Sequence, residues 1–259
     1  AEQKLVKTND PAIKEINEQE SANKTTVNKK EKTKRKWDFF VAVTAGRFST
    51  GNSYLGQTAN SDYYSSPDAN NNSGSPSSSS FQPSPVKPGF SFSSVVKVSR
   101  KFSAKTAIAI GLGYQYAGTS ITTGQMLSGS SRDNFGTGNA NEFHNQYHFI
   151  QLPVEIQSMI GKGKKLPLYW NAGFTFSRLI SANVLQFDRS QALYFKDNSY
   201  LNNTAVGVSG GLSLGVLKKQ KTAWLIGPQF YYSLTPVAGS GLYNKTHYSF
   251  LGLQLQKKL

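Results

Sequence analysis

The 259-residue chain has no cysteine, and it has no apolar run long enough to form a membrane-spanning helix. The absence of cysteine excludes disulfide bonds, a thiolate metal site and a lipidated N-terminal cysteine. Acidic residues are scarce, because 14 Asp and Glu stand against 29 Lys and Arg, which gives a net charge of +15. A basic excess of this size can indicate nucleic-acid binding, so its placement along the chain decides its meaning.

What the chain does have is a regular alternation, clearest in residues 204–234. Small residues alternate with apolar ones in 205–216, and apolar or aromatic residues alternate with small or polar ones in 224–234. A period of two places the two sets on opposite faces of a β-strand. Neither face carries the charged side chains of a water-exposed sheet. Lipid on one side and a narrow, crowded interior on the other explain both faces, so the segment is predicted to be a transmembrane β-hairpin.

Similar alternation marks eight segments in all: 37–46, 90–99, 107–116, 150–160, 168–177, 205–216, 224–234 and 247–259. Short basic turns alternate with long loops, which are predicted at 49–87, 121–145, 182–202 and 236–245. This order of connections predicts an all-β fold, an eight-stranded antiparallel up-and-down transmembrane β-barrel. Both ends of the barrel segment then lie at the rim of the short turns, which in such barrels faces the periplasm.

Residues 1–36 differ in composition from the rest of the chain. They lack aromatic residues and hold ten Lys and Arg against six Asp and Glu, so they cannot bury a core. We expect a flexible, disordered, basic periplasmic tail or linker at 1–36, followed by the barrel at 37–259. A short surface helix near 12–21 is the alternative for the tail. Because Ala1 is neither Met nor part of an apolar leader, we expect that a signal peptide or a larger upstream part has been removed.

Three features carry a family resemblance: the Lys-rich approach to WDFFVAVTAGRF at 37–48, the strand YHFIQLPVEIQ at 147–157, and the lysines of every short turn. With them, the span 37–259 resembles the small outer-membrane β-barrel proteins of Bacteroidota, the PorT-like group. The resemblance implies this fold and an outer-membrane location, with lipid and lipopolysaccharide as surroundings. It implies no particular activity, because this fold hosts several functions.

Lysine dominates the predicted periplasmic rim, and no acidic residue lies in its turns. The rim lysines are Lys101, Lys105, Lys162, Lys164, Lys165, Lys218, Lys219, Lys221, Lys257 and Lys258. A cationic ring at the lipid headgroups, anchoring the barrel at a fixed depth, explains this placement. A docking surface for an acidic periplasmic partner is the alternative. Nucleic acid is not expected as a partner, because the ring would lie in the periplasm. Arg47 and Arg178, near the outer ends of their strands, are expected to reach lipopolysaccharide or the loops.

Inside the predicted barrel, charge is scarce. Lys97 lies five residues before Phe102 in the first turn, and Glu155 lies six residues before Gly161 in the second. Both face inward, at similar depth, on strands that run in the same direction. Because an unpaired ion in a narrow interior is costly, we expect these residues to form a lumen charge pair. The pair is predicted to plug the lumen rather than to relay protons or ions.

Candidate catalytic and metal-binding residues are few, since the chain has 3 histidines. His247-Tyr248-Ser249 resembles the His-x-Ser element of outer-membrane lipid A deacylases, but no acidic residue follows it to orient the histidine. His144 and His148 have the spacing of metal ligands on a helix, yet in a strand such residues lie about 13 Å apart. We therefore predict no catalytic residue, no metal and no cofactor.

The predicted function is non-enzymatic. The barrel is expected to be a structural or interaction subunit of an envelope complex, with a plugged lumen, that meets other envelope proteins through its loops, basic rim or tail. One alternative is the C-terminal barrel of a dual-membrane-spanning anti-sigma-type regulator or envelope sensor, which this linker-then-barrel arrangement resembles. A second alternative, a small-solute channel, is disfavoured because eight strands leave an interior that side chains fill.

Overall fold

The computed structural model describes residues 37–51, 83–127, 134–160, 167–188, 191–216, 224–238 and 246–259. The predicted tail at 1–36 and most of the first long loop lie outside these residues. Within the described part of the chain, no helix is long and apolar enough to cross a membrane.

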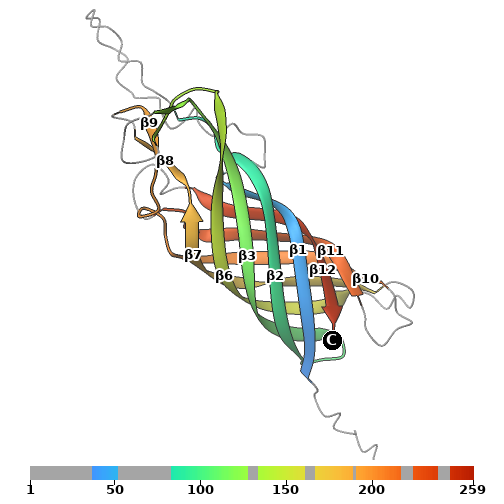
Figure 1. Ribbon diagram of the computed structural model, residues 1–259. Coiled ribbons are helices and arrows are strands. Elements are labelled where there is room, and N and C mark those ends of the chain that lie inside the picture. Colours follow the sequence, from blue (N-terminus) through green and yellow to red (C-terminus); the bar gives the residue numbers. More distant parts are fainter. Residues whose placement is uncertain are drawn as a thin grey trace, which may run out of the picture. The chain divides into compact units, whose positions relative to one another are not determined.

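Eight strands close into an antiparallel barrel in the order β1-β12-β11-β10-β7-β6-β3-β2, which confirms the predicted fold (Figure 1). The strands are β1 (Trp37–Thr50), β2 (Lys87–Lys101), β3 (Thr106–Thr123), β6 (Asn141–Ile160), β7 (Leu168–Asn183), β10 (Thr204–Val216), β11 (Trp224–Pro236) and β12 (His247–Lys258). We call the end with the short turn at 102–105 the turn rim, and the opposite end the loop rim.

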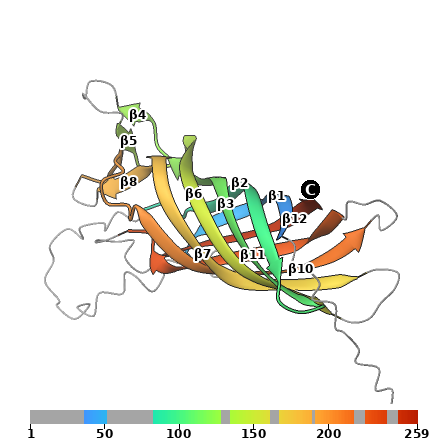
Figure 2. The same cartoon turned by 90° about the horizontal axis from the view of Figure 1, so that it is seen from below.

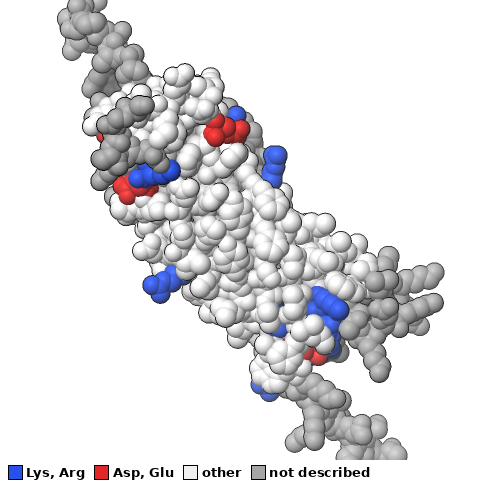
Figure 3. Space-filling view, viewed as in Figure 1, with Lys and Arg blue, Asp and Glu red and all other residues white. Residues whose placement is uncertain are grey.

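The alternation of residue types matches the two faces of the barrel wall. Leu112, Phe174 and Leu253 are exposed on the outside, whereas Thr44 and Ser91 are buried on the inside. A wall that exposes large apolar side chains and buries small polar ones suits a lipid exterior. On the face drawn in Figure 3, charged side chains gather toward the two ends, and most of the surface between them is uncharged.

The first and last strands close the barrel along a continuous seam. β1 pairs with β12 from Phe40 opposite Lys258 to Thr50 opposite Tyr248. At the turn rim, Nζ of Lys258 lies 2.6 Å from Oδ1 of Asp38, so an ion pair joins the ends of the two strands. Closure leaves no unpaired edge in the barrel sheet.

The loop rim carries more regular structure than the sequence analysis predicted. A second sheet in the order β4-β5-β9-β8 lies there, formed by β4 (Met126–Leu127), β5 (Asn134–Gly136), β8 (Leu185–Asp188) and β9 (Leu193–Lys196) (Figure 2). β3 and β6 also continue pairing as far as Thr123 opposite Asn141. The prediction of loops throughout 121–145 and 182–202 is therefore wrong. A small core of Ile121, Leu185, Phe187 and Tyr194 supports this loop sheet.

Candidate functional site

The half of the lumen nearer the turn rim contains the predicted charge pair. Nζ of Lys97 on β2 lies 2.7 Å from Oε2 of Glu155 on β6, and the two side chains are only 4% and 9% exposed. β3 runs between them, with Gly111 opposite Lys97 and Ala109 opposite Glu155. Desolvation of both ions is costly, and their close contact offsets that cost.

The small residues of β3 make this contact possible. A Cβ atom on Gly111 would lie 2.8 Å from Cγ1 of Val95 and 3.0 Å from Cγ of Lys97. Because the first distance is shorter than real carbon atoms allow and the second is tighter than most contacts, a side chain at this position would push against Val95 and the stem of Lys97. The alternation of small residues that predicts an inward face in 107–116 thus also makes space for the long charged side chain.

Amide side chains extend this polar half across the barrel. Nε2 of Gln151 donates to Oε1 of Gln115 at 2.5 Å, and Nε2 of Gln115 donates to Oγ of Ser91 at 3.1 Å. Nδ2 of Asn171 donates to Oε1 of Gln229 at 3.0 Å. A cavity of about 50 Å³ remains among these groups, beside the charge pair. It has room for a few water molecules but not for an open solute path.

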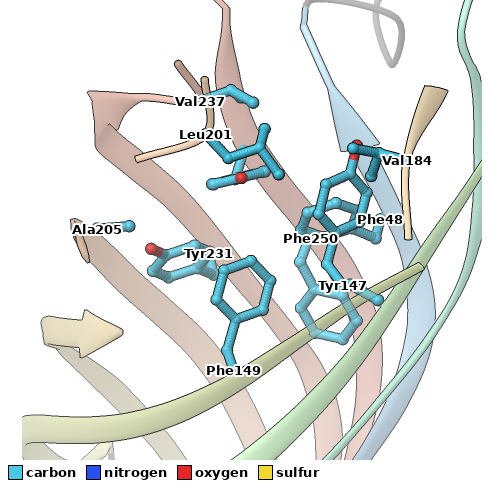
Figure 4. Packing of buried hydrophobic residues seen from close by; sticks show 11 residues of the cluster. Phe48, Tyr147, Phe149, Val184, Leu201, Ala205, Tyr231, Val237 and Phe250 are labelled. Carbon is cyan, nitrogen blue, oxygen red and sulfur yellow. The ribbon is translucent and has the colours of Figure 1, made fainter. Parts of the chain in front are cut away.

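The half of the lumen nearer the loop rim is filled by aromatic rings. We call this the aromatic cluster; its rings are Phe48, Tyr147, Phe149, Tyr231, Tyr248 and Phe250 (Figure 4). The ring centroids of Phe48 and Tyr248 lie 5.3 Å apart, and those of Phe149 and Tyr248 lie 5.4 Å apart in an edge-to-face contact. Such contacts, with large buried area, make a dry seal.

Segments outside the barrel strands complete this seal. Val184, Leu201 and Val237 belong to the same buried cluster, and they come from connections at the loop rim. Leu201 also forms a β-bridge with Ala238, which joins two of these connections. The aromatic cluster is thus covered on the side that faces the loops.

Most of the aromatic cluster is not among the predicted inward residues, although the sequence carries a signal for it. Along β6, Tyr147 and Phe149 alternate in step with Gln151 and Glu155, which are predicted to face inward. Phe250 likewise shares its parity on β12 with the buried Gln254. If the alternation is continued along β6 and β12 toward the loop rim, it places these rings inside the barrel.

The predicted basic rim is only partly within the described residues. Lys101 and Lys105 are exposed, and Lys257 and Lys258 are half-buried. The six other predicted lysines, Lys162, Lys164, Lys165, Lys218, Lys219 and Lys221, lie outside the described residues. An acid adjoins this rim: Asp38 lies 2.6 Å from Lys258 and 4.0 Å from Lys101.

Two tryptophans accompany the cations of the turn rim. The guanidinium carbon of Arg100 lies 5.4 Å from the ring centroid of Trp37, and Nζ of Lys257 lies 5.1 Å from that of Trp224. Cation–π contacts of this kind hold each cation against the face of an aromatic ring at this end of the barrel.

The candidate catalytic and metal-binding histidines are engaged in structural contacts or lie apart. Nδ1 of His247 donates to the backbone oxygen of Ser233 at 2.9 Å, and its ring stacks on Tyr232. His144 is exposed, four residues from His148 along β6. In the described part of the chain, no group of three or more His, Cys, Asp or Glu is placed to hold a metal ion.

A comparison with known families decides what kind of barrel this is. Residues 17–239 match the family described as outer membrane protein beta-barrel domain. The chain belongs to this family. Its closed barrel is therefore an outer-membrane β-barrel, with the apolar wall in contact with lipid. No curated protein is significantly similar to the chain.

Two solved structures resemble this outer-membrane barrel. Neisserial surface protein A aligns over 85% of this chain and 97% of its own, with 11% identity and a TM-score of 0.40. AlkL, an outer membrane protein studied in lipid bilayers, aligns over 87% of this chain and 89% of its own, with 11% identity and a TM-score of 0.33. The narrower resemblance to PorT-like barrels of Bacteroidota stays a prediction.

Proposed function

We propose that this outer-membrane barrel is a non-enzymatic structural or interaction subunit of the cell envelope, and that it acts through its rims and loops rather than as a conduit. The observation that carries the proposal is the double closure of the lumen. The polar half is crossed by a buried ion pair and amide bonds, and the other half is filled by the aromatic cluster. A solute would have to displace both.

The loop sheet supports the choice of an interaction role. It gives the loop rim a supported surface, and its β4 strand carries the exposed side chains of Met126 and Leu127. Exposed apolar groups at a rim are available to neighbouring envelope proteins. The partner in this proposal is another envelope protein, in a complex that also includes lipid and lipopolysaccharide.

Single-channel recording tests the closed lumen. The purified barrel in planar bilayers should give no resolved conductance steps, whereas a porin inserted into the same bilayers should give them. Regular steps from the wild-type protein would contradict the proposal and favour the channel alternative.

The proposal places the loop rim outside the cell and both ends of the barrel segment in the periplasm. The chain has no cysteine, so single substitutions can report this orientation. Gln125 lies at the loop rim and Ala104 lies in the turn at 102–105, and both residues are exposed. We therefore choose the variants Gln125→Cys and Ala104→Cys. A membrane-impermeant maleimide should label Gln125→Cys on whole cells and Ala104→Cys only after the outer membrane is permeabilised. The reverse pattern would invert the orientation.

A further inference from the structure

Three polar side chains surround Ile150 on the outside of the barrel. Tyr114 on β3 and Arg178 on β7 are the cross-strand neighbours of Ile150 on its two sides. His148 is the preceding outward residue on β6, opposite Tyr116. With strands about 4.8 Å apart, the backbones of Tyr114 and Arg178 are separated by about 10 Å, so long side chains can meet over Ile150. We call Tyr114, His148 and Arg178 the outer polar group.

The histidine of this group is fixed by its neighbours. The hydroxyl oxygen of Tyr114 lies 2.6 Å from Nδ1 of His148, and the Tyr116 ring meets the imidazole edge-on at 5.5 Å between centroids. A phenol hydroxyl can donate to an imidazole nitrogen, and the proton of the neutral ring then resides on Nε2. In that arrangement His148 offers its Nε2–H as a further donor. His247 differs, because its Nδ1–H is already used on a backbone oxygen.

The charge around the group is positive. Arg178 is exposed, and among the described residues it forms no ion pair with a carboxylate. Glu142 is the one acid on the outward faces of β3, β6 and β7 as described, six residues before His148 on β6. At the rise of a strand, that separation is about 20 Å. The group therefore lacks an internal counter-ion.

Its position on the wall is the boundary of the apolar zone. Toward the turn rim, the next outward residues are Leu112, Leu152 and Phe176, all exposed. Toward the loop rim, Ile180 on β7 is still apolar and exposed, but the outward positions of β3 and β6 become polar, as at Thr122 and Glu142. A cation at this boundary lies at the depth of lipid headgroups, with acyl chains against the apolar residues beside it.

We propose that the outer polar group binds the phosphate of a membrane-lipid headgroup in the leaflet around the loop rim. The Arg178 guanidinium donates to two phosphate oxygens, which its planar geometry favours, and His148 Nε2–H donates to the same group. Tyr114 is a positioning residue that holds the imidazole. The lipid is the ligand rather than free phosphate, because Ile150, Leu152 and Phe176 adjoin the group and accept an acyl chain.

Native mass spectrometry tests the site. The purified barrel, in an uncharged detergent, is titrated with diphosphoryl lipid A, and the bound fraction gives an affinity. Arg178→Gln removes the charge and leaves an amide that can still donate one neutral hydrogen bond, so binding should weaken about tenfold to a hundredfold, the ratio expected for the loss of one charge-assisted hydrogen bond. His148→Ala should weaken it about twofold to tenfold. The same lipid without its phosphates loses both contacts, so the wild type should bind it more weakly than Arg178→Gln binds the intact lipid.

Matched variants separate the site from general charge. Arg100→Gln removes an arginine at the turn rim, and His247→Gln changes a histidine outside the outer polar group; both should bind like the wild type. Slower gel mobility of the boiled than the unboiled protein checks that each variant is folded. Equal weakening in all four variants, or no preference for the phosphorylated lipid, would overturn the proposal. Displacement of lipid A by excess inorganic phosphate would overturn the assignment of a lipid ligand.

Discussion

The two halves of the lumen are closed by different physical means. Near the turn rim, Lys97 and Glu155 hold each other within a set of amide hydrogen bonds. Near the loop rim, rings pack on rings, and the hydroxyl of Tyr248 has no hydrogen-bond partner among the described residues. The polar half is stable only while its charges stay paired, whereas the aromatic cluster depends on filled volume. The lumen is therefore closed in one half by an ion pair and hydrogen bonds, which require a specific geometry, and in the other half by apolar packing, which does not.

Breaking the ion pair should have the largest effect. Glu155→Ala leaves Lys97 buried without its counter-ion, so we expect the free energy of unfolding to fall by about 3–5 kcal/mol. Urea unfolding of the barrel in lipid vesicles measures the change. The double variant Lys97→Met/Glu155→Leu removes both charges and should recover most of the loss. If Glu155→Ala and Lys97→Ala both leave stability unchanged, the pair does not contribute to closure.

Emptying part of the aromatic cluster should cost somewhat less. Phe149→Ala removes a ring with 3% exposure, and we expect a loss of about 3 kcal/mol in the same assay, from lost burial and the cavity left behind. Phe174→Ala is the matched control, because Phe174 faces outward and lipid fills the space that its ring leaves. Equal losses in the two variants would show that inward packing adds nothing beyond contact with lipid.

The smallest effect should come from the unpaired hydroxyl. Tyr248→Phe keeps the ring and deletes a buried oxygen that has no partner in the described residues. Since a buried polar group without a hydrogen bond is unfavourable, the variant should be more stable by about 1 kcal/mol. A loss of stability would instead show that the hydroxyl is hydrogen-bonded in the lumen.

The sequence was sufficient for the faces of the strands and for the charge pair. Alternation with a period of two decides which residues share a face, and counting from the short turns sets the depth of Lys97 and Glu155. The structure brings these two side chains to 2.7 Å. Counting residues from the turns is reliable at this depth because the strand pairing has no irregularity here. Lys97 lies opposite Gly111 and Glu155 lies opposite Ala109, each within a continuous register.

The aromatic cluster was not predicted because the predicted strand at 150–160 begins after Tyr147 and Phe149, although the alternation continues through them. The pairing between strands also becomes irregular near the loops. The register shifts between Pro88 and Ser91, between His148 and Phe149, and between Tyr232 and Pro236, all in the half nearer the loop rim. Beyond each irregularity, counting residues from the turn no longer shows which residues of neighbouring strands lie opposite each other. The strands of the loop sheet are also short, with four residues in β8 and in β9, so an alternating pattern hardly rises above chance.

Because β1 pairs with β12, the barrel can close only after almost the whole chain has been synthesised. The hydrogen bond from Gln254 to Thr44 joins residues 210 positions apart, and every pair along this seam has a similar separation. The ribosome makes Thr44 long before Gln254, so β1 must wait for its last neighbour until nearly the whole barrel has been synthesised. Until then, β1 and the newest strand are open edges, which other chains could pair with. A nascent barrel of this topology therefore needs protection during its export, and a chain cut short before β12 would keep both edges open.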